Sequence, residues 1–383
     1  MKKILIAIPY LYPFGEAYAA RTRALCKLFQ ETGYEVDILC DKITPNFSGK
    51  EYGNIYSLEK DYQGLKKLFL LPRDYAKKMD SLLEEEHYSF LLSSSMFDRF
   101  GYILKVARKH RVKLILESCE WYDIKAFRHG RFDIRYFQFL WCFKNLFKKV
   151  DGVVAISRLL KKYYSEDGTK CVVIPGIHDV EKIDYRENLP KGEKLKLLFS
   201  GNIGGGKEMF SELLDAIYML KTEGKTVELH IFGPSMEAVI LNLDSEGKRA
   251  YKNIEDRIIF HGKIPQDKMT QACSQYDFGI FFRPDRRSSH AGFPTKLGEY
   301  LSAGTPVITN DTGDISLVME NGVNGYMLST TADAEEIKTV LNVCIAQSQK
   351  ERNNMRKAAR ATAIKRLDYH DYVEALKNFL DIL

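Results

Sequence analysis

The sequence predicts an α/β protein with two Rossmann-like domains, each built on a doubly wound parallel sheet, that face a central cleft. Short apolar runs rich in β-forming residues alternate with helical patterns, stop in a polar stretch over 179–193, and then begin again. The chain has 383 residues, which suits two domains of ordinary size better than one core. We therefore expect an N-terminal domain over 1–185 and a C-terminal domain over 190–365.

The first half begins with an apolar run over 4–10, which predicts a buried strand, and continues with a helical pattern over 17–31. Further short apolar runs predict the remaining strands, because buried parallel strands are almost continuously apolar. These strands are expected over 35–41, 90–95, 112–118, 152–158 and 171–176.

The second half repeats this alternation. Its strands are expected over 196–201, 228–233, 258–262, 278–282 and 306–310. A helix is expected over 208–224, soon after the first of these strands. The last stretch, 367–383, has the spacing of an amphipathic helix. It could pack on either domain, and we favour a return to the first.

The composition is that of a globular protein, with 45% hydrophobic and 28% charged residues. No apolar stretch approaches the roughly 20 residues of a membrane span, and the N-terminal run is more typical of a buried strand than of a signal peptide. Seven scattered cysteines without a CxxC pair indicate reduced thiols and a cytoplasmic protein. A net charge of +6 fits nucleic acid no better than anionic substrates or lipid head groups, and we expect no nucleic-acid partner.

A glycine-rich loop follows the strand expected at 196–201. Its pattern, Gly201-x-x-x-x-Gly206-Lys207, falls short of a P-loop, because Glu208 stands where Ser or Thr would reach Mg²⁺. The loop also lacks the G-x-G start of a dinucleotide site. The backbone N–H groups of a glycine turn and the Lys207 side chain still favour a phosphate. The alternative is an ordinary turn with a solvated lysine.

A second loop follows the strand expected at 278–282 and leads into a helix that begins at Pro294 and Thr295. The N-terminus of this helix and Lys296 form a second candidate phosphate site. Glu299 lies one turn further along, on the same side as Thr295. There its carboxylate can accept hydrogen bonds from a ribose diol.

At this helix the sequence resembles a known family. FPTKLGEYLSAGTPVI, residues 293–308, closely resembles the donor-site segment of GT-B glycosyltransferases, in the retaining group called family 4 or glycosyltransferase group 1. Other stretches resemble motifs of the same family, and the resemblance covers nearly the whole chain. These stretches are PFGEAYAARTRALCKLF, KCVVIPGIHD, FHGKIPQDKMTQACSQYDFGIFF and NGVNGYML.

The resemblance implies a nucleotide-sugar donor, a UDP-sugar, bound by the C-terminal domain at the cleft. Glu299 would hold the ribose, and Lys207 would pair with the diphosphate. Asn202 stands near the position of a family arginine. The other implied contacts are Gly15 near the phosphates, the backbone of Lys263 and Ile264 at the base, and Phe293, Pro294, Thr295 and Lys296 around the sugar and diphosphate.

The sequence departs from the family at one position that contacts the sugar. The family usually has two glutamates separated by seven residues, and the first of them corresponds to Ala291 here. Asp285 lies in the same loop but out of register. The usual contact to the donor sugar is therefore missing or rearranged.

Cleavage of the bond between the sugar C1 and the diphosphate builds negative charge, which Lys207, Lys296 and Asn202 are suited to stabilise. No DxD-like cluster lies in a likely donor loop, and the histidines are isolated in the sequence. We therefore expect neither a metal nor a cofactor. The resemblance implies same-face attack, in which the leaving phosphate receives the proton of the acceptor hydroxyl.

Two charged residues of the first half have alternative roles. Glu120 follows the strand expected at 112–118 and could orient the acceptor or the sugar as part of the catalytic site. It could equally be a surface carboxylate beside Trp121, since charged residues lie mostly in solvent. Arg21 is either a contact in the cleft or a charge on the surface of a helix.

Two stretches, 62–78 and 124–149, mix basic and aromatic residues. Such helices can lie on an anionic membrane surface, which would suit a lipid-linked acceptor and a peripheral position at the inner face of the cell membrane. The alternative is a core-packed helix with a solvated basic face, because the apolar residues of the second stretch recur at helical spacing.

We therefore expect a hexosyltransferase that extends a cell-envelope polysaccharide or a lipid-linked glycan. A GT-B sugar-nucleotide epimerase is one alternative, although such enzymes usually carry His and acidic residues at the cleft that we cannot place here. A non-catalytic partner subunit of a glycosyltransferase complex is another. Ala291 favours it, whereas the intact Lys207 and Glu299 argue against it.

Overall fold

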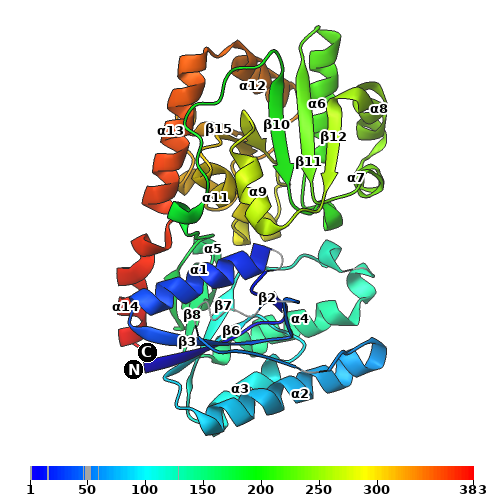
Figure 1. The fold of residues 1–383 in the computed structure, drawn as a ribbon. Helices are drawn as coiled ribbons and strands as arrows, with labels where there is room; N and C mark the ends of the chain where they lie inside the picture. Colours follow the sequence, from blue (N-terminus) through cyan, green and yellow to red (C-terminus); the bar gives the residue numbers. More distant parts are fainter. Residues whose placement is uncertain (1, 15–16, 46, 48–52, 59, 128) are drawn as a thin grey trace. The chain divides into compact units, whose positions relative to one another are not determined.

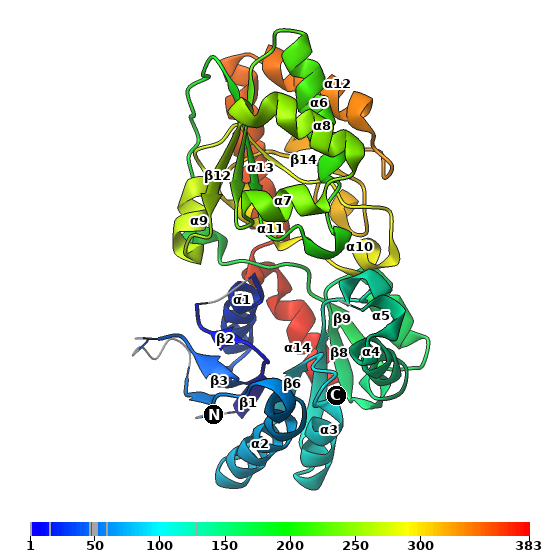
Figure 2. The same cartoon turned by 90° about the vertical axis from the view of Figure 1, so that its right-hand side faces the viewer.

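The computed structural model describes residues 2–14, 17–45, 47, 53–58, 60–127 and 129–383. Contacts divide the chain into two compact units. The first consists of Met1–Ile177 together with Tyr369–Leu383, and the second of His178–Asp368. Within the described residues each unit contains one large parallel sheet, of seven strands in the first unit and six in the second (Figures 1 and 2). The predicted α/β class with two Rossmann-like domains is confirmed.

The sheet of the first unit has the order β5-β3-β1-β6-β7-β8-β9, and all its neighbouring strands are parallel. β1, which spans Lys2–Ala7, is a central strand, and the burial of its last four residues explains their continuous apolar run. The other strands are β3 Tyr34–Cys40, β5 Ile55–Ser57, β6 Phe90–Ser94, β7 Lys113–Ser118, β8 Gly152–Ala155 and β9 Lys170–Val173.

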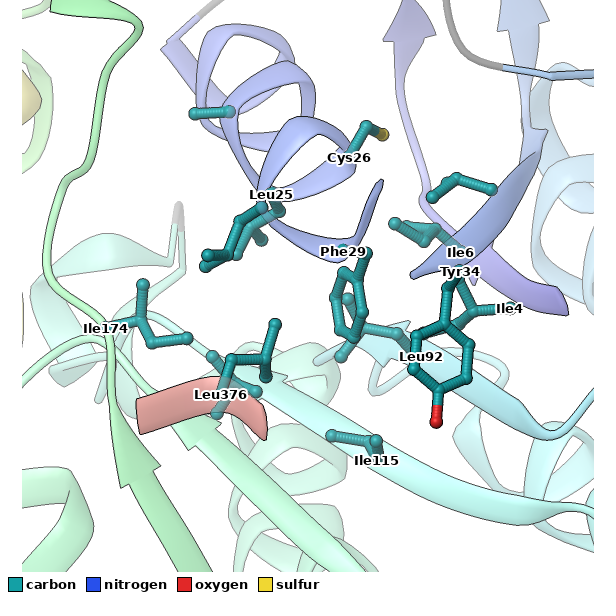
Figure 3. Close-up of a cluster of buried hydrophobic side chains, with 14 of the residues drawn as sticks. Ile4, Ile6, Leu25, Cys26, Phe29, Tyr34, Leu92, Ile115, Ile174 and Leu376 are labelled. Atoms are coloured by element: carbon teal, nitrogen blue, oxygen red, sulfur yellow. The ribbon is translucent and has the colours of Figure 1, made fainter. Parts of the chain in front are cut away.

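Helices pack on this sheet around one core. Figure 3 shows Ile4 of β1, Phe29 of α1, Leu92 of β6, Ile115 of β7 and Leu376 of α14 within a single buried cluster. The helices are α1 Ala17–Glu31, α2 Gly64–Glu85, α3 Phe100–Lys109, α4 Ile134–Asn145, α5 Arg158–Ser165 and α14 Val373–Asp381, with single 3₁₀ turns at Ile124–Ala126, Gly130–Phe132 and Phe147–Lys149. Two short strands, β2 Leu11–Tyr12 and β4 Lys42–Ile43, pair separately.

The strand predicted over 152–158 is shorter than expected and ends at Ala155. Ser157 is the N-cap of α5, because its side chain accepts a hydrogen bond from Leu160 N at 3.3 Å. The predicted range therefore covers a strand, a helix cap and Arg158, the first residue of a helix.

The single helix predicted over 367–383 is also wrong in its extent. A 3₁₀ turn, Tyr369–Tyr372, precedes α14, and the turn and the helix both pack against α1 of the first unit. Asp368 instead accepts a hydrogen bond from Val180 N at 3.0 Å in the second unit. The chain passes from one unit to the other at this point, so one continuous helix cannot form.

The sheet of the second unit has the order β12-β11-β10-β13-β14-β15, again with parallel neighbours. Its strands are β10 Leu195–Ser200, β11 Val227–Phe232, β12 Ile258–Gly262, β13 Phe278–Ile280, β14 Val307–Asn310 and β15 Gly325–Leu328. Its helices are α6 Phe210–Thr222, α7 Met236–Asn242, α8 Ser245–Ile254, α9 Gln266–Cys273, α10 Arg287–Ala291, α11 Thr295–Ser302, α12 Ala334–Ala346 and α13 Gln349–Arg366. Among the described helices, none combines the length and the apolar character needed to cross a membrane.

The polar stretch predicted as a linker over 179–193 packs on the second unit. The buried guanidinium of Arg356 on α13 donates from Nε to the carbonyl of Arg186 at 2.9 Å and from Nη1 to that of Tyr276 at 2.9 Å. Gln349 Nε2 donates to Leu189 O at 2.7 Å. Polar side chains of the stretch contact the second unit as well, since Arg186 Nη1 donates to Gln275 Oε1 and Lys191 Nζ to Gln347 O, both at 2.7 Å.

Candidate functional site

The two loops singled out in the sequence follow neighbouring strands of the second sheet. β10 pairs with β13, so their carboxyl ends lie at one edge of the sheet, where ligands of such sheets bind. Met209 N donates to Phe282 O at 2.8 Å, and Arg286 Nη1 donates to Gly206 O at 3.1 Å. The structure therefore brings the glycine loop and the loop after β13 together.

The glycine loop turns sharply at the end of β10. Gly201 has a φ of +127° and Gly206 a φ of +64°, which favour glycine over other residues. Asn202 is exposed and its Oδ1 accepts a hydrogen bond from Gly204 N at 2.9 Å. Lys207 is exposed as well, between the 3₁₀ turn Gly204–Gly206 and the start of α6.

Lys296 reaches from α11 to the glycine loop, 88 positions earlier in the sequence, where its Nζ lies 2.5 Å from Glu208 Oε1. Its side chain is only 12% exposed, and Nζ lies 4.1 Å from the centre of the Phe199 ring. Burial lowers the pKa of Lys296, and the charge of Glu208 opposes this shift. Lys296 is thus a cation held close to the end of β10.

Glu208 is the partner that this arrangement depends on. Its side chain is 7% exposed, and it occupies the position where a P-loop would have Ser or Thr. A carboxylate that pairs with a lysine cannot supply the hydroxyl ligand of Mg²⁺. The geometry thus supports the rejection of a P-loop.

α11 presents the other predicted donor contacts. Pro294 is its N-cap residue, and no side chain in the described structure caps this end. Glu299 is buried, and its negative charge raises the pKa of Lys296, which shows that the two side chains lie near each other. Phe293 is buried too, whereas Thr295 is partly exposed at the helix start.

Lys263 and Ile264 directly follow β12, at the same edge of the sheet but on its outermost strand. Lys263 is exposed and Ile264 is half-buried. Backbone hydrogen bonds connect this loop to the glycine loop through β11, because Gly201 N donates to Phe232 O at 3.1 Å and Gly233 N to Gly262 O at 2.8 Å.

Ala291, at the position of the first family glutamate, is buried at the end of the short helix α10. Asp285 is engaged elsewhere, because its Oδ1 lies 2.6 Å from His290 Nε2. His290 Nδ1 accepts from Gly313 N at 3.0 Å, so Nε2 carries the proton that is donated to Asp285.

Sequence reasoning missed two arginines in the loop after β13, close to the glycine loop. Arg286 contacts the glycine loop through Gly206 O, and Arg283 donates from Nη1 to Ser289 O at 2.8 Å. The charge of Arg283 also lowers the pKa of Lys296, which places it near that ammonium group. The basic run RPDRR was visible in the sequence, but its direction toward the glycine loop depends on the pairing of β10 with β13.

The predicted residues of the first unit form hydrogen bonds at the carboxyl ends of its strands. Tyr18 Oη donates to Glu120, which is half-buried. Arg21 is not a surface charge: its side chain is 3% exposed, and it donates from Nε to Glu117 Oε1 at 2.8 Å and from Nη2 to Ile174 O at 2.9 Å. Gly15 lies outside the described residues.

His110 lies near two acidic side chains that are distant from it in the sequence. The ligand atoms of Asp80, Glu84 and His110 lie within 4.8 Å of one another. Lys109 Nζ lies 2.8 Å from both carboxylates and already supplies a positive charge. The ion pairs explain this cluster without a metal.

Two family models match the chain. The model Glycosyltransferase Family 4 matches residues 19–182, and the model Glycosyl transferases group 1 matches residues 194–347, so together they span most of both units. A curated relative, an uncharacterized glycosyltransferase of Methanocaldococcus jannaschii, is 26% identical over 225 residues, which are 56% of this chain. The match spans about half of that relative's length, 53%.

Several solved structures have a similar backbone. TarM has a TM-score of 0.73 at 11% identity, over 100% of this chain and 99% of its own. Sucrose-phosphate synthase from Thermosynechococcus elongatus has a TM-score of 0.70 at 14% identity, over 99% and 98% of the two chains. Anabaena HepE, solved with UDP and glucose and with UDP-glucose, has a TM-score of 0.70 at 16% identity, with 100% of both chains covered. At these identities the likeness shows a shared fold.

Proposed function

Because the chain belongs to the GT-B glycosyltransferases, we propose that it transfers a sugar from a UDP-sugar to a polysaccharide or lipid-linked glycan, with retention of configuration. The observation that carries this proposal is the meeting of the glycine loop and α11 at one edge of the second sheet, through Lys296 and Glu208. The complexes of HepE with UDP and UDP-glucose support uracil as the base of the donor.

In this proposal the second unit binds the donor. Lys207, Lys296 and Asn202 hold the diphosphate, and Glu299 accepts hydrogen bonds from the ribose diol. The backbone of Lys263 and Ile264 contacts the base. Phe293, Pro294 and Thr295 line the sugar and diphosphate at the start of α11.

The reaction breaks the bond between the sugar C1 and the diphosphate oxygen and forms a bond from C1 to the acceptor oxygen on the same face. The leaving phosphate takes the proton of the acceptor hydroxyl. Lys207 and Lys296 neutralise the charge that develops on the leaving group, which is the role that a metal has in other transferases. We therefore propose transfer without a metal or a cofactor, with Glu120 orienting the acceptor.

We further propose that the first unit rests on an anionic membrane surface, at the inner face of the cell membrane. One face of α4 packs in the core through Phe139, Cys142 and Phe143. A core-packed helix with a solvated basic face was the alternative, but the opposite face of α4 also exposes apolar residues. That exposed face includes Ile134, Phe137 and Trp141, with Phe132 just before the helix.

The spacing and the charges of this surface fit a membrane interface. Ile134, Phe137 and Trp141 lie three and four positions apart, so they share one side of the helix. The exposed residues Arg131 and Lys144 flank them. The start of α2 has a similar composition, with exposed Lys66, Lys67, Leu68, Phe69 and Leu70. Aromatic side chains beside basic residues are typical of proteins that bind anionic lipid head groups.

A binding experiment with Glu299→Ala tests the donor site. Loss of charge-assisted hydrogen bonds of about 1.5–3 kcal/mol each should weaken UDP binding at least tenfold. Binding is measured by calorimetry and by thermal shift with UDP, GDP, CDP, ADP, NAD and ATP with Mg²⁺. Glu246→Ala, at an exposed position of α8, is the matched control and should bind UDP as the wild type does.

The same panel separates the alternatives. A response to UDP without Mg²⁺ supports the proposal, and a response only to ATP with Mg²⁺ contradicts it. Protein that binds no nucleotide would instead be a non-catalytic partner subunit, which Ala291 favours. Conversion of a UDP-sugar to its epimer in the absence of acceptor, followed by NMR, would identify an epimerase.

A further inference from the structure

We propose that Glu208 determines donor specificity by accepting a hydrogen bond from a hydroxyl group of the donor sugar. This inference rests on the proposed function, because it requires a nucleotide sugar in the second unit. It adds a contact from the glycine loop to the sugar. In this chain Ala291 stands where the family usually has a glutamate that contacts the sugar.

One oxygen of the Glu208 carboxylate is unexplained by the protein. Oε1 lies 2.5 Å from Lys296 Nζ, but Oε2 is buried and has no hydrogen-bond partner among the described residues. Buried polar atoms of native proteins almost always have a partner. The side chain is 7% exposed, so bulk water does not account for this oxygen. A ligand that brings a donor group to Oε2 would account for it.

The position of Glu208 selects the kind of ligand. It lies between Lys207 and Met209, whose N–H group contacts the loop after β13, and it faces the ammonium group of Lys296. In the proposed complex these lysines hold the diphosphate, and the sugar is bonded directly to that diphosphate. A hydroxyl group of the sugar therefore lies within reach of the residues around Lys296.

The charges of Lys296 and Glu208 also favour a hydroxyl group as the partner of Oε2. A phosphate oxygen would be repelled by a carboxylate, whereas a hydroxyl group donates to it. Lys296 Nζ, 2.5 Å from Oε1, offsets the repulsion between the carboxylate and the nearby diphosphate. Asp285 is unsuited to this role, because it is exposed and its carboxylate pairs with His290 at 2.6 Å.

The experiment measures how much the sugar adds to the affinity of UDP. Dissociation constants are determined for UDP and for UDP-glucose, UDP-galactose and UDP-N-acetylglucosamine, with wild-type protein, Glu208→Gln and Glu208→Ala. For the sugar that binds best, we expect Glu208→Ala to reduce the ratio of the two affinities by roughly tenfold or more, as for loss of a hydrogen bond to a charged acceptor. Asp285→Asn is the matched carboxylate control and should leave the ratio unchanged.

Deoxy forms of the best UDP-sugar identify the hydroxyl group. Removal of the contacting hydroxyl should weaken binding to the wild type and have no further effect on Glu208→Ala, since the two changes remove the same contact. Retained UDP binding shows that each variant is folded. Glu208→Gln serves if the alanine variant is unstable, because its amide keeps the shape of the side chain.

The outcomes distinguish this inference from the proposed function. Wild-type protein that fails to bind UDP contradicts both. If UDP binds but the ratio of the two affinities is unchanged in both glutamate variants, the inference is wrong. Equal weakening of UDP and UDP-sugar would then show that Glu208 only positions Lys296.

Discussion

At the scale of residues, the ion pair between Lys296 and Glu208 gives the candidate site its main electrostatic property. The two side chains are mostly buried, with Nζ and Oε1 2.5 Å apart. Burial disfavours the charged form of a lysine, and the nearby carboxylate favours it. The net result is a lowered pKa for Lys296, whose ordinary value is 10.5. A cation with a lowered pKa loses its charge at a lower pH than an exposed lysine does.

This property predicts a pH dependence for nucleotide binding. Only protonated Lys296 attracts a diphosphate, so UDP affinity should fall as the pH rises through the lowered pKa, before 10.5 is reached. The change is followed by calorimetry in steps of pH above neutrality. In Lys296→Met the affinity should be weaker by about tenfold at neutral pH.

Lys296→Met also controls for the titration of the uracil base of UDP, which affects binding to both proteins equally. The difference between the two pH profiles therefore belongs to Lys296. Identical profiles for wild type and variant would contradict a role for this ammonium group in binding.

At the scale of elements, the strands were predictable and their ends were less so. The apolar runs of β1, β10 and β11 lie in buried central strands, where composition and structure agree. β5 and β15 were not predicted, because they are only three and four residues long and partly exposed. The end of β8 was missed because a cap such as Ser157 looks like any other serine in the sequence.

In the candidate site, residues within one short segment were predictable from the sequence, whereas contacts between distant segments were not. The sequence singles out Glu299 and Lys296 as candidates because they share a short segment with a specific pattern. The pairing of Lys296 with Glu208 joins positions 88 apart, so it depends on the order of strands in the sheet. Local patterns cannot supply that order, and the direction of Arg286 toward Gly206 was missed for the same reason.

The capping box of α13 allows a test of element stability. The Ser348 side chain accepts from Glu351 N, and the Glu351 side chain accepts from Ser348 N at 2.7 Å. Ser348→Ala removes the first of these bonds and should reduce the free energy of unfolding by about 1 kcal/mol. Urea unfolding monitored by circular dichroism measures the change. Lys350→Ala, in the same exposed turn, should stay within about 0.5 kcal/mol of wild type.

At the scale of the whole molecule, the two units differ in what their surfaces offer. The second unit contains the candidate donor site. The first unit contains α4, whose exposed Trp141 is 57% accessible, and Phe132, just before this helix, is 82% accessible. Single exposed apolar residues are ordinary, but an aromatic stripe flanked by basic residues is a feature of interaction surfaces. This surface would hold the protein at the membrane, where the proposed lipid-linked acceptor lies.

Vesicle co-sedimentation tests that role with the full chain. Wild-type protein should bind vesicles that contain phosphatidylglycerol more tightly than neutral phosphatidylcholine vesicles, and salt should weaken this preference. Phe137→Ser combined with Trp141→Ser should reduce binding by about tenfold or more, since each aromatic side chain buries apolar area in the interface. Arg131→Gln combined with Lys144→Gln should instead remove about 1 kcal/mol per charge, and only on anionic vesicles. Leu241→Ser, at an 81% exposed position of α7 in the second unit, is the matched control and should bind as wild type does. Equal binding by all four proteins, or none by the wild type, would show that α4 does not contact the membrane.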